Sequence, residues 1–170
     1  LKKKKKKNTL STSTTRTRII AEEMITCFAI VGKTDEPLFL RPYIDDNEDP
    51  LKFHSIVHSS LDMVDEFKAQ RSTSMNALQN PDMYIGHLCP IEEYRVFGYI
   101  TNTNIKFIAV LEDSDPVREH DLKNLFVAAH QLYVNYYRNP FAPIKKPLKS
   151  ERVRLGIDRQ VNSYNFDVSA

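Results

Sequence analysis

Several residue types are scarce in this chain of 170 residues, and each scarcity excludes a class of protein. The two cysteines, Cys27 and Cys89, are too few for a disulfide framework and fit a reducing, cytosolic compartment. The four glycines form neither a dinucleotide-binding fingerprint nor a P-loop. No apolar run reaches the ~18 residues of a membrane span. No apolar segment typical of a secretory signal follows the first lysines.

Net positive charge is absent outside residues 1–23. That segment holds eight basic and two acidic residues, and the whole chain carries +2, so residues 24–170 carry −4. A nucleic-acid-binding domain would carry its basic patch on the fold itself, so the charge distribution argues against this class. Residues 1–23 also lack apolar periodicity and are expected to form a disordered leader. The lysine run is interpreted as a solvated tail or a translated leader upstream of Met24, with attraction to anionic lipid or nucleic acid as the alternative.

Residues 24–165 show regular apolar patterns, which predict one domain. Continuous or alternating apolar runs predict strands, and apolar residues at steps of three and four predict helices. The strands are expected at residues 25–31, 38–43, 83–89, 94–101 and 105–111. The helices are expected at residues 51–68, from Asp115-Pro116 to Pro140, and at residues 150–164, with a flexible loop at 70–81 and a loose end at 166–170.

This order, β-β-α-β-β-β-α-α, predicts an α/β (α+β) domain. Consecutive strands joined by tight turns favour a mainly antiparallel sheet, and the helices must bury their apolar stripes on it. The run from Ile105 to Leu111 is largely apolar, so the last strand is expected to lie in the centre of the sheet.

The most distinctive polar cluster lies on the first helix and consists of His54, His58, Asp62 and Asp65. Two histidines four residues apart can chelate zinc, which makes a metal hydrolase one hypothesis. The general-base glutamate of such motifs is absent, and Asp62 is too far along the helix from His54 to share one ion. We therefore expect no metal site and no catalytic residues, and we interpret the cluster as a solvated or protein-binding surface.

Two other groups of residues could carry function. His87 and Cys89 are two apart on a strand, so a cysteine–histidine contact is geometrically possible, but buried packing is the favoured interpretation. Tyr137 and Phe141 lie at the end of the second helix. Their surroundings are not basic enough for nucleic-acid stacking, and both are candidate anchors for a protein partner.

Four segments of the chain resemble sedlin-family subunits of the trafficking protein particle (TRAPP) complex. The first hairpin, Met24–Phe39, and the first helix, Leu51–Glu66, resemble the family broadly. Tyr84–Asn102 and Asn139–Phe141 resemble its subunit-2-like branch. The resemblance covers Met24 to Tyr164. The leader before Met24 has no counterpart, and the stretch from Lys145 to Lys149 is unusually basic with no role implied.

The resemblance implies a longin-like (SNARE-like) fold, a five-stranded sheet with one helix on one face and two on the other. It implies a non-catalytic subunit, without cofactor, of a complex that tethers vesicles and activates a Rab GTPase in endoplasmic reticulum–Golgi transport. The partners would be other TRAPP subunits and, indirectly, the Rab GTPase. The location would be cytoplasmic and perinuclear, peripheral to those membranes. The alternative is a stand-alone longin-type regulatory domain that binds a SNARE or a small GTPase.

Overall fold

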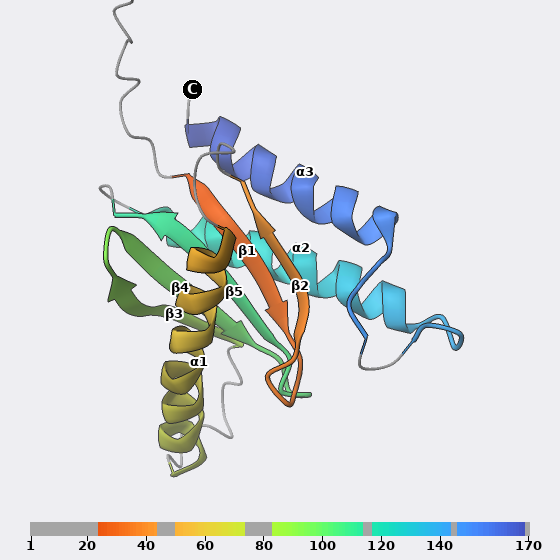
Figure 1. The fold of residues 1–170 in the computed structure, drawn as a ribbon, viewed down its shortest axis with the longest axis horizontal. Coiled ribbons are helices and arrows are strands. Elements are labelled where there is room, and N and C mark those ends of the chain that lie inside the picture. Colours follow the sequence, from red (N-terminus) through yellow and green to blue (C-terminus); the bar gives the residue numbers. More distant parts are fainter. Residues whose placement is uncertain (1–23, 44–49, 74–82, 114–116, 144–145, 169–170) are drawn as a thin grey trace, which may run out of the picture.

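The computed structural model describes residues 24–43, 50–73, 83–113, 117–143 and 146–168, which form one sheet flanked by helices (Figure 1). The expected leader lies outside these residues. The elements follow the predicted order and confirm the α+β class: β1 (Ile25–Val31), β2 (Pro37–Pro42), α1 (Pro50–Thr73), β3 (Tyr84–Ile91), β4 (Tyr94–Ile100), β5 (Lys106–Glu112), α2 (Glu119–Tyr137) and α3 (Glu151–Val168).

The sheet has five strands in the order β2-β1-β5-β4-β3, and every neighbouring pair is antiparallel. Strand β5 lies in the middle, as its apolar sequence predicts, and all of its residues except Glu112 are buried. Strands β2 and β3 form the two edges. The turn between β4 and β5 uses Asn104 in the left-handed conformation, with φ of 61°, which asparagine tolerates better than most residues.

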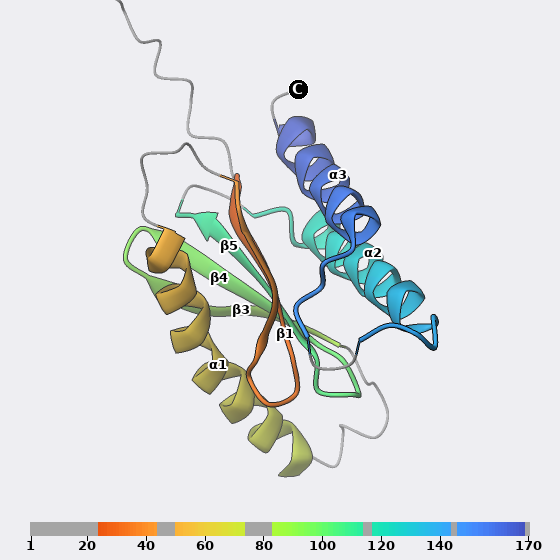
Figure 2. The same cartoon turned by 45° about the vertical axis from the view of Figure 1, so that its right-hand side comes forward.

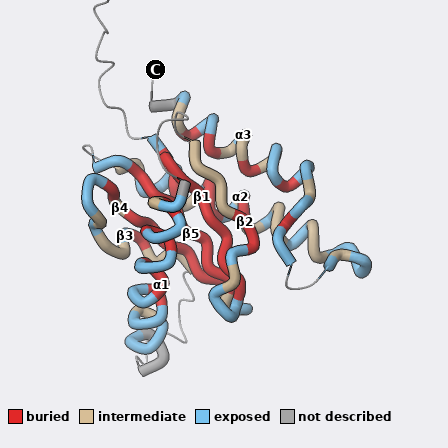
Figure 3. Tube along the Cα trace, in the orientation of Figure 1, coloured by how far each residue is buried: buried red, intermediate tan, exposed pale blue. Residues whose placement is uncertain are grey.

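Helix α1 covers one face of the sheet, and α2 and α3 cover the other (Figures 1 and 2). Alternate residues of a strand point to opposite faces, so β1 contributes to both layers of the core. Phe28 and Ile30 join the cluster under α2 and α3, whereas Cys27 and Ala29 join the cluster under α1. Figure 3 shows the consequence: the three inner strands β1, β5 and β4 are buried between helices whose outward sides are exposed. The expected distribution of helices is confirmed.

Helix α2 is attached to the sheet through an aromatic cluster centred on Phe126. This residue is fully buried, and its ring centroid lies 5.9 Å from that of Phe28, 6.0 Å from that of Tyr84 and 5.8 Å from that of Tyr99. These partners come from β1, β3 and β4, so one side chain of the helix contacts rings on three strands. Phe126 is therefore the main packing link between α2 and the sheet.

The start of α2 was predicted wrongly. Asp115 and Pro116 are expected to open the helix, but it begins at Glu119, and Arg118 at the N-cap position makes no side-chain capping hydrogen bond. Glu119 and Asp121 place carboxylates in the first turn, where the helix dipole favours negative charge. That interaction stabilises a start further along the chain. Residues 114–116 lie outside the described part of the structure.

Two helices extend beyond their predicted ends. Helix α1 continues to Thr73, into the stretch expected to be a loop, and Gln70 donates a hydrogen bond to Glu66 one turn before it. Helix α3 continues to Val168, so residues 166–168 of the expected loose end are helical. Asn165 accepts a hydrogen bond from the backbone N–H of Ile25 at 2.9 Å, which ties the last turns of α3 to β1. Residues 74–82 and 169–170 lie outside the described part.

Candidate protein-interaction surface

Helix α1 is fixed to the sheet by one apolar side. Phe53, Val57, Leu61 and Val64 recur at steps of three and four residues, and all four are buried. The ring of Phe53 meets that of Tyr94 on β4 edge-on, with 5.7 Å between centroids. Because this side is used for packing, the opposite side of the helix faces solvent.

Three of the predicted residues lie on this outward side. His54, His58 and Asp62 are all exposed. They follow one another at four-residue steps, which places them on successive turns of one helix face, as expected. We call these three residues the α1 outer face. It presents two imidazoles and one carboxylate, which can form hydrogen bonds and an ion pair with a partner.

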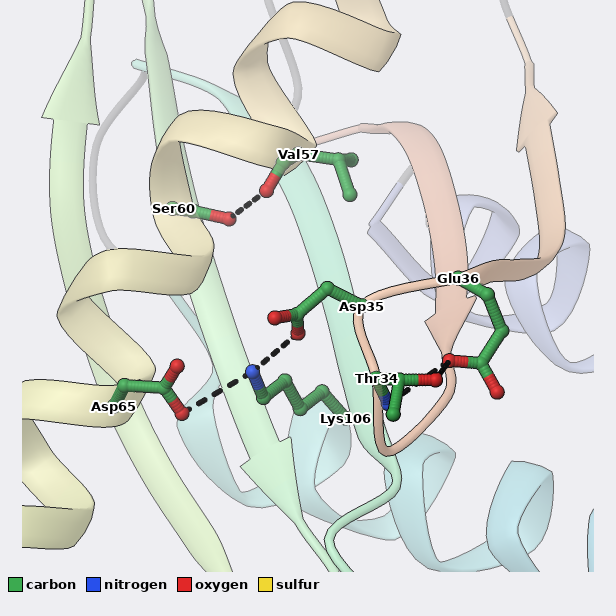
Figure 4. A network of polar contacts seen from close by, with 7 residues as sticks. All are labelled: Thr34, Asp35, Glu36, Val57, Ser60, Asp65 and Lys106. Carbon is green, nitrogen blue, oxygen red and sulfur yellow. Dashed lines mark hydrogen bonds and ion pairs between the residues drawn. The ribbon is translucent and has the colours of Figure 1, made fainter.

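Asp65, the fourth predicted residue, has a different environment (Figure 4). Its carboxylate lies 3.2 Å from Nζ of Lys106 on β5, and the carboxylate of Asp35 in the β1–β2 turn lies 2.6 Å from the same nitrogen. The side chain of Lys106 is only 3% exposed, whereas those of Asp35 and Asp65 are about half exposed. We call these three residues the Lys106 network. Asp65 therefore ties α1 to the sheet at the border of the α1 outer face.

The Lys106 network was not identified from the sequence. A signal for it was present, since a single lysine inside an otherwise apolar central strand needs charged or hydrogen-bonding partners when it is buried. The partners themselves could not be derived from spacing, because Asp35 is 71 residues away along the chain. The three groups meet only in the folded chain, because β1 pairs with β5 beside Lys106 and α1 covers the face of the sheet on which Lys106 meets Asp65.

The two aromatic candidates differ in exposure. Tyr137 is half-buried, and its ring lies 4.7 Å from that of Tyr133 and 5.1 Å from that of Tyr136. It packs against the main core cluster and is less available to a partner than expected. Phe141, in the loop after α2, is 90% exposed. The structure therefore leaves Phe141 as the accessible member of the pair.

A shallow hollow of about 200 Å³ lies beside α1, between the second half of that helix and the edge strand β3. Edge strands are sites where another chain can pair or pack. The hollow extends the surface next to the α1 outer face, and its lining combines apolar, acidic and amide groups from both elements: Met63, Glu66, Phe67, Gln70, Ile85, His87 and Leu88.

Neither cysteine has the environment of a nucleophile. Burial raises the pKa of the Cys27 thiol from 9.0 to about 12, and burial also raises the pKa of Cys89. The ring of His87 packs edge-on against that of Phe97, with 5.4 Å between centroids. A β-bulge separates the pairing positions of His87 and Cys89. Because the thiolate is the reactive form, a raised pKa lowers the reactivity of both thiols, and Cys27 is in addition fully buried.

We expect Cys27 to resist thiol reagents while the protein is folded. A chromogenic disulfide reagent at mildly alkaline pH should titrate at most one thiol, that of Cys89, because Cys27 is fully buried. Unfolding in guanidinium should make the thiol of Cys27 accessible to the reagent as well. Cys89→Ser is the control, and in this variant the folded protein should show no fast reaction. Two fast thiols in the folded protein would contradict the buried position of Cys27.

Within the described part of the chain, no three histidine, cysteine, aspartate or glutamate side chains converge closely enough to hold a metal ion. None of α1, α2 and α3, as far as they are described, has the length and apolar character needed to cross a bilayer.

Comparison with known proteins identifies relatives over most of the fold. Residues 30–163 match the family model described as Sedlin. The chain is 39% identical over 130 residues to the trafficking protein particle complex subunit 2-like protein of Dictyostelium discoideum, an alignment that covers 75% of this chain and 89% of that protein. It is 36% identical over 119 residues to the Bos taurus protein of the same name, covering 69% and 83%.

A more distant relative is trafficking protein particle complex subunit 20 of Saccharomyces cerevisiae. It is 24% identical over 157 residues, which covers 72% of this chain and 88% of the yeast protein. The resemblance was inferred from four short segments. The alignments extend it over 83% to 89% of the length of these three relatives.

Proposed function

The chain belongs to the sedlin family, and from this membership we propose that it is a subunit of the trafficking protein particle (TRAPP) complex. The extent of the match carries the proposal. The aligned region covers 89% of the Dictyostelium discoideum relative and 83% of the Bos taurus relative, so nearly all of each relative has a counterpart here. The matched residues, 30–163, run from the end of β1 into α3 and include the whole of α1.

In the proposed role the chain acts through protein contacts and catalyses no reaction of its own. It contributes to a complex that tethers vesicles in endoplasmic reticulum–Golgi transport and acts on a Rab GTPase through other subunits. Its location is cytoplasmic and perinuclear, at the periphery of those membranes. Two observations support a binding role: an exposed polar side on α1, and buried or half-buried thiols with raised pKa values.

The leading contact surface in this proposal is the α1 outer face, with Asp65 at its border. The helix beneath it is held by buried apolar residues and by the Lys106 network, so the exposed groups are presented on a rigid element. Pre-organised side chains lose less conformational entropy on binding than side chains of a mobile loop. A partner that pairs with Asp62 and hydrogen-bonds to the histidines would use this rigidity.

Asp62→Tyr tests the surface. The substitution removes a charge and adds bulk at an exposed position, so we expect it to weaken binding to the neighbouring TRAPP subunit at least tenfold. The free energy of unfolding should change by less than about 0.5 kcal/mol, because surface substitutions away from buried groups rarely affect stability more. The measurements are affinity capture of the complex and chemical denaturation of the isolated chain.

The control is Glu119→Tyr on α2, which makes the same change of charge and bulk at an exposed site behind the other face of the sheet. It should leave capture of the complex intact. If both variants, or neither, lose the complex, the α1 outer face is not the contact surface.

Co-purification separates the proposed role from the alternative longin-type regulatory domain. Capture of the tagged chain from cells should yield a large assembly with several TRAPP subunits at stoichiometric amounts. A single SNARE or small GTPase, bound transiently and without those subunits, would favour the regulatory domain and contradict the assembly role.

A further inference from the structure

Positive charge gathers at the connection between α2 and α3. Among the described residues from 138 to 154, five are basic and only Glu151 is acidic, although residues 24–170 as a whole carry −4. The rest of the fold is therefore clearly acidic. Arg154 pairs with Glu151 at 3.6 Å. The other four basic residues form no ion pair with any described residue, and all four are exposed: Arg138, Lys146, Lys149 and Arg152.

The connection is held against the body by Leu148. The backbone N–H of Leu148 donates a hydrogen bond to the carbonyl of Leu38 on β2 at 2.7 Å, and the Leu148 side chain is buried. Lys146 and Lys149 flank this anchored residue and stay exposed. Arg152 and Asn139 line the same hollow, of about 600 Å³, between the end of α2 and the start of α3. The basic residues are thus gathered at one end of the α2–α3 pair.

Phe141 projects from the same end of the molecule. The loop after α2 extends beyond the last helical turn in both views (Figures 1 and 2). Asn139 orders this loop, because its side-chain oxygen accepts from the N–H of Phe141 at 3.1 Å and its carbonyl accepts from the N–H of Ala142 at 3.0 Å. The ring is 90% exposed, more than any other large apolar side chain described.

We propose that the α2–α3 connection is a membrane-contact surface for a bilayer that contains anionic lipids. Arg138, Lys146, Lys149 and Arg152 bind the headgroups, and Phe141 inserts its ring at the interface between headgroups and acyl chains. Basic residues near an anionic surface and an aromatic side chain at its interfacial depth are the two features that hold peripheral proteins on membranes. The proposal does not depend on assembly into the TRAPP complex.

The composition of the surface favours a bilayer over a protein partner. Lysine is depleted in the cores of protein interfaces, which instead contain contiguous aromatic and apolar groups. Here one strongly exposed ring, that of Phe141, lies at the same end of the molecule as four exposed basic side chains that form no ion pair with a described residue. The rest of residues 24–170 carries net negative charge, which anionic lipid would repel, so within the described part of the chain the basic end is the one that such a bilayer attracts.

Vesicle flotation tests the basic residues. All versions are the full chain with Lys2–Lys7 changed to serine, so that the leader does not bind lipid itself. Each lysine near the surface contributes roughly fivefold in binding, so Lys146→Glu with Lys149→Glu should weaken partitioning into vesicles of phosphatidylcholine and phosphatidylserine by roughly 25-fold or more. The control is Lys33→Glu with Lys68→Glu, the same charge change at exposed sites in the β1–β2 turn and on α1. This control should change partitioning less than about threefold.

Fluorescence tests the insertion of Phe141. The chain has no tryptophan, so Phe141→Trp introduces a single reporter. Its emission should shift to shorter wavelength with anionic vesicles and not with pure phosphatidylcholine vesicles. Leu51→Trp, at an exposed position in the first turn of α1, is the control and should show no shift.

Three results would overturn the proposal. One is equal loss of partitioning in both charge-reversal pairs, which would show a general charge effect. Another is an unchanged emission wavelength of Phe141→Trp when anionic vesicles are added. The third is unchanged vesicle binding in the Lys146 and Lys149 variant together with loss of co-purified TRAPP subunits, which would make the connection a protein contact. Capture of the complex by the Asp62→Tyr variant tests the assembly role separately.

Discussion

Replacement of Phe126 by alanine is expected to lower the free energy of unfolding by about 4 kcal/mol. The side chain is fully buried and contacts rings of Phe28, Tyr84 and Tyr99. Truncation to alanine loses the transfer free energy of the ring and leaves a cavity bordered by β1, β3 and β4. Because three separate strands line this cavity, no single side chain can move in to fill it.

An effect of this size is a large fraction of the total stability of a small domain, which is commonly 5–15 kcal/mol. Guanidinium denaturation followed by circular dichroism measures it. The matched control is Phe166→Ala on α3, where the ring is 73% exposed, and there the change should stay within about 0.5 kcal/mol. Equal effects of the two substitutions would show that Phe126 does not anchor α2.

The layers of the fold could be predicted because apolar periodicity is a local property. The continuous apolar run of β1 and the three- and four-residue steps in α1 are visible within a short window of sequence. The central position of β5 also follows, because a strand buried on both faces must be apolar along its length. Each of these features depends on neighbours in the chain, and each was confirmed.

The limits of the helices were less predictable, because they depend on competition between signals. The pair Asp115-Pro116 has the composition of a helix start, yet α2 begins at Glu119, where carboxylates in the first turn interact with the helix dipole. At its C-terminal end α3 reaches Val168. The side chain of Asn165 in this helix accepts a hydrogen bond from the backbone N–H of Ile25, which lies 140 residues earlier in the sequence. Sequence spacing cannot reveal a hydrogen bond between residues so far apart.

The candidate surface likewise has residues whose position follows from local sequence and one whose contact depends on distant parts of the chain. The outward position of His54, His58 and Asp62 follows from helical periodicity, and the structure places all three there. Asp65 has the same periodicity but contacts Lys106, because the side of α1 nearest the β1–β2 turn comes close to β5. Whether the α1 outer face binds a TRAPP subunit stays a prediction, tested by Asp62→Tyr.

The second large effect is expected at the Lys106 network. Asp35→Asn combined with Asp65→Asn should lower the free energy of unfolding by about 3 kcal/mol, because it leaves the ammonium group of a buried lysine without a counter-charge. Asparagine is the suitable replacement because Asp35 has φ of 62°, a left-handed conformation that asparagine adopts with little strain. The amide oxygens can still accept hydrogen bonds, which keeps the loss at the lower end of the range for broken buried pairs.

Lys106→Met should behave differently, although it breaks the same two ion pairs. Methionine fills a similar volume with apolar atoms, and the two carboxylates it leaves are about half exposed, so water can solvate them. The expected change is within about 1 kcal/mol.

Adding Lys106→Met to the double asparagine variant should then recover at least about 2 kcal/mol, because the stranded charge is removed. Denaturation of the four proteins forms a mutant cycle that separates the cost of burying the charge from the attraction of its partners. A loss in Lys106→Met as large as in the double asparagine variant, with no recovery in the triple variant, would show that the ion pairs themselves stabilise the fold. The recovery expected here would instead show that the two carboxylates are needed chiefly to compensate the charge of a buried lysine.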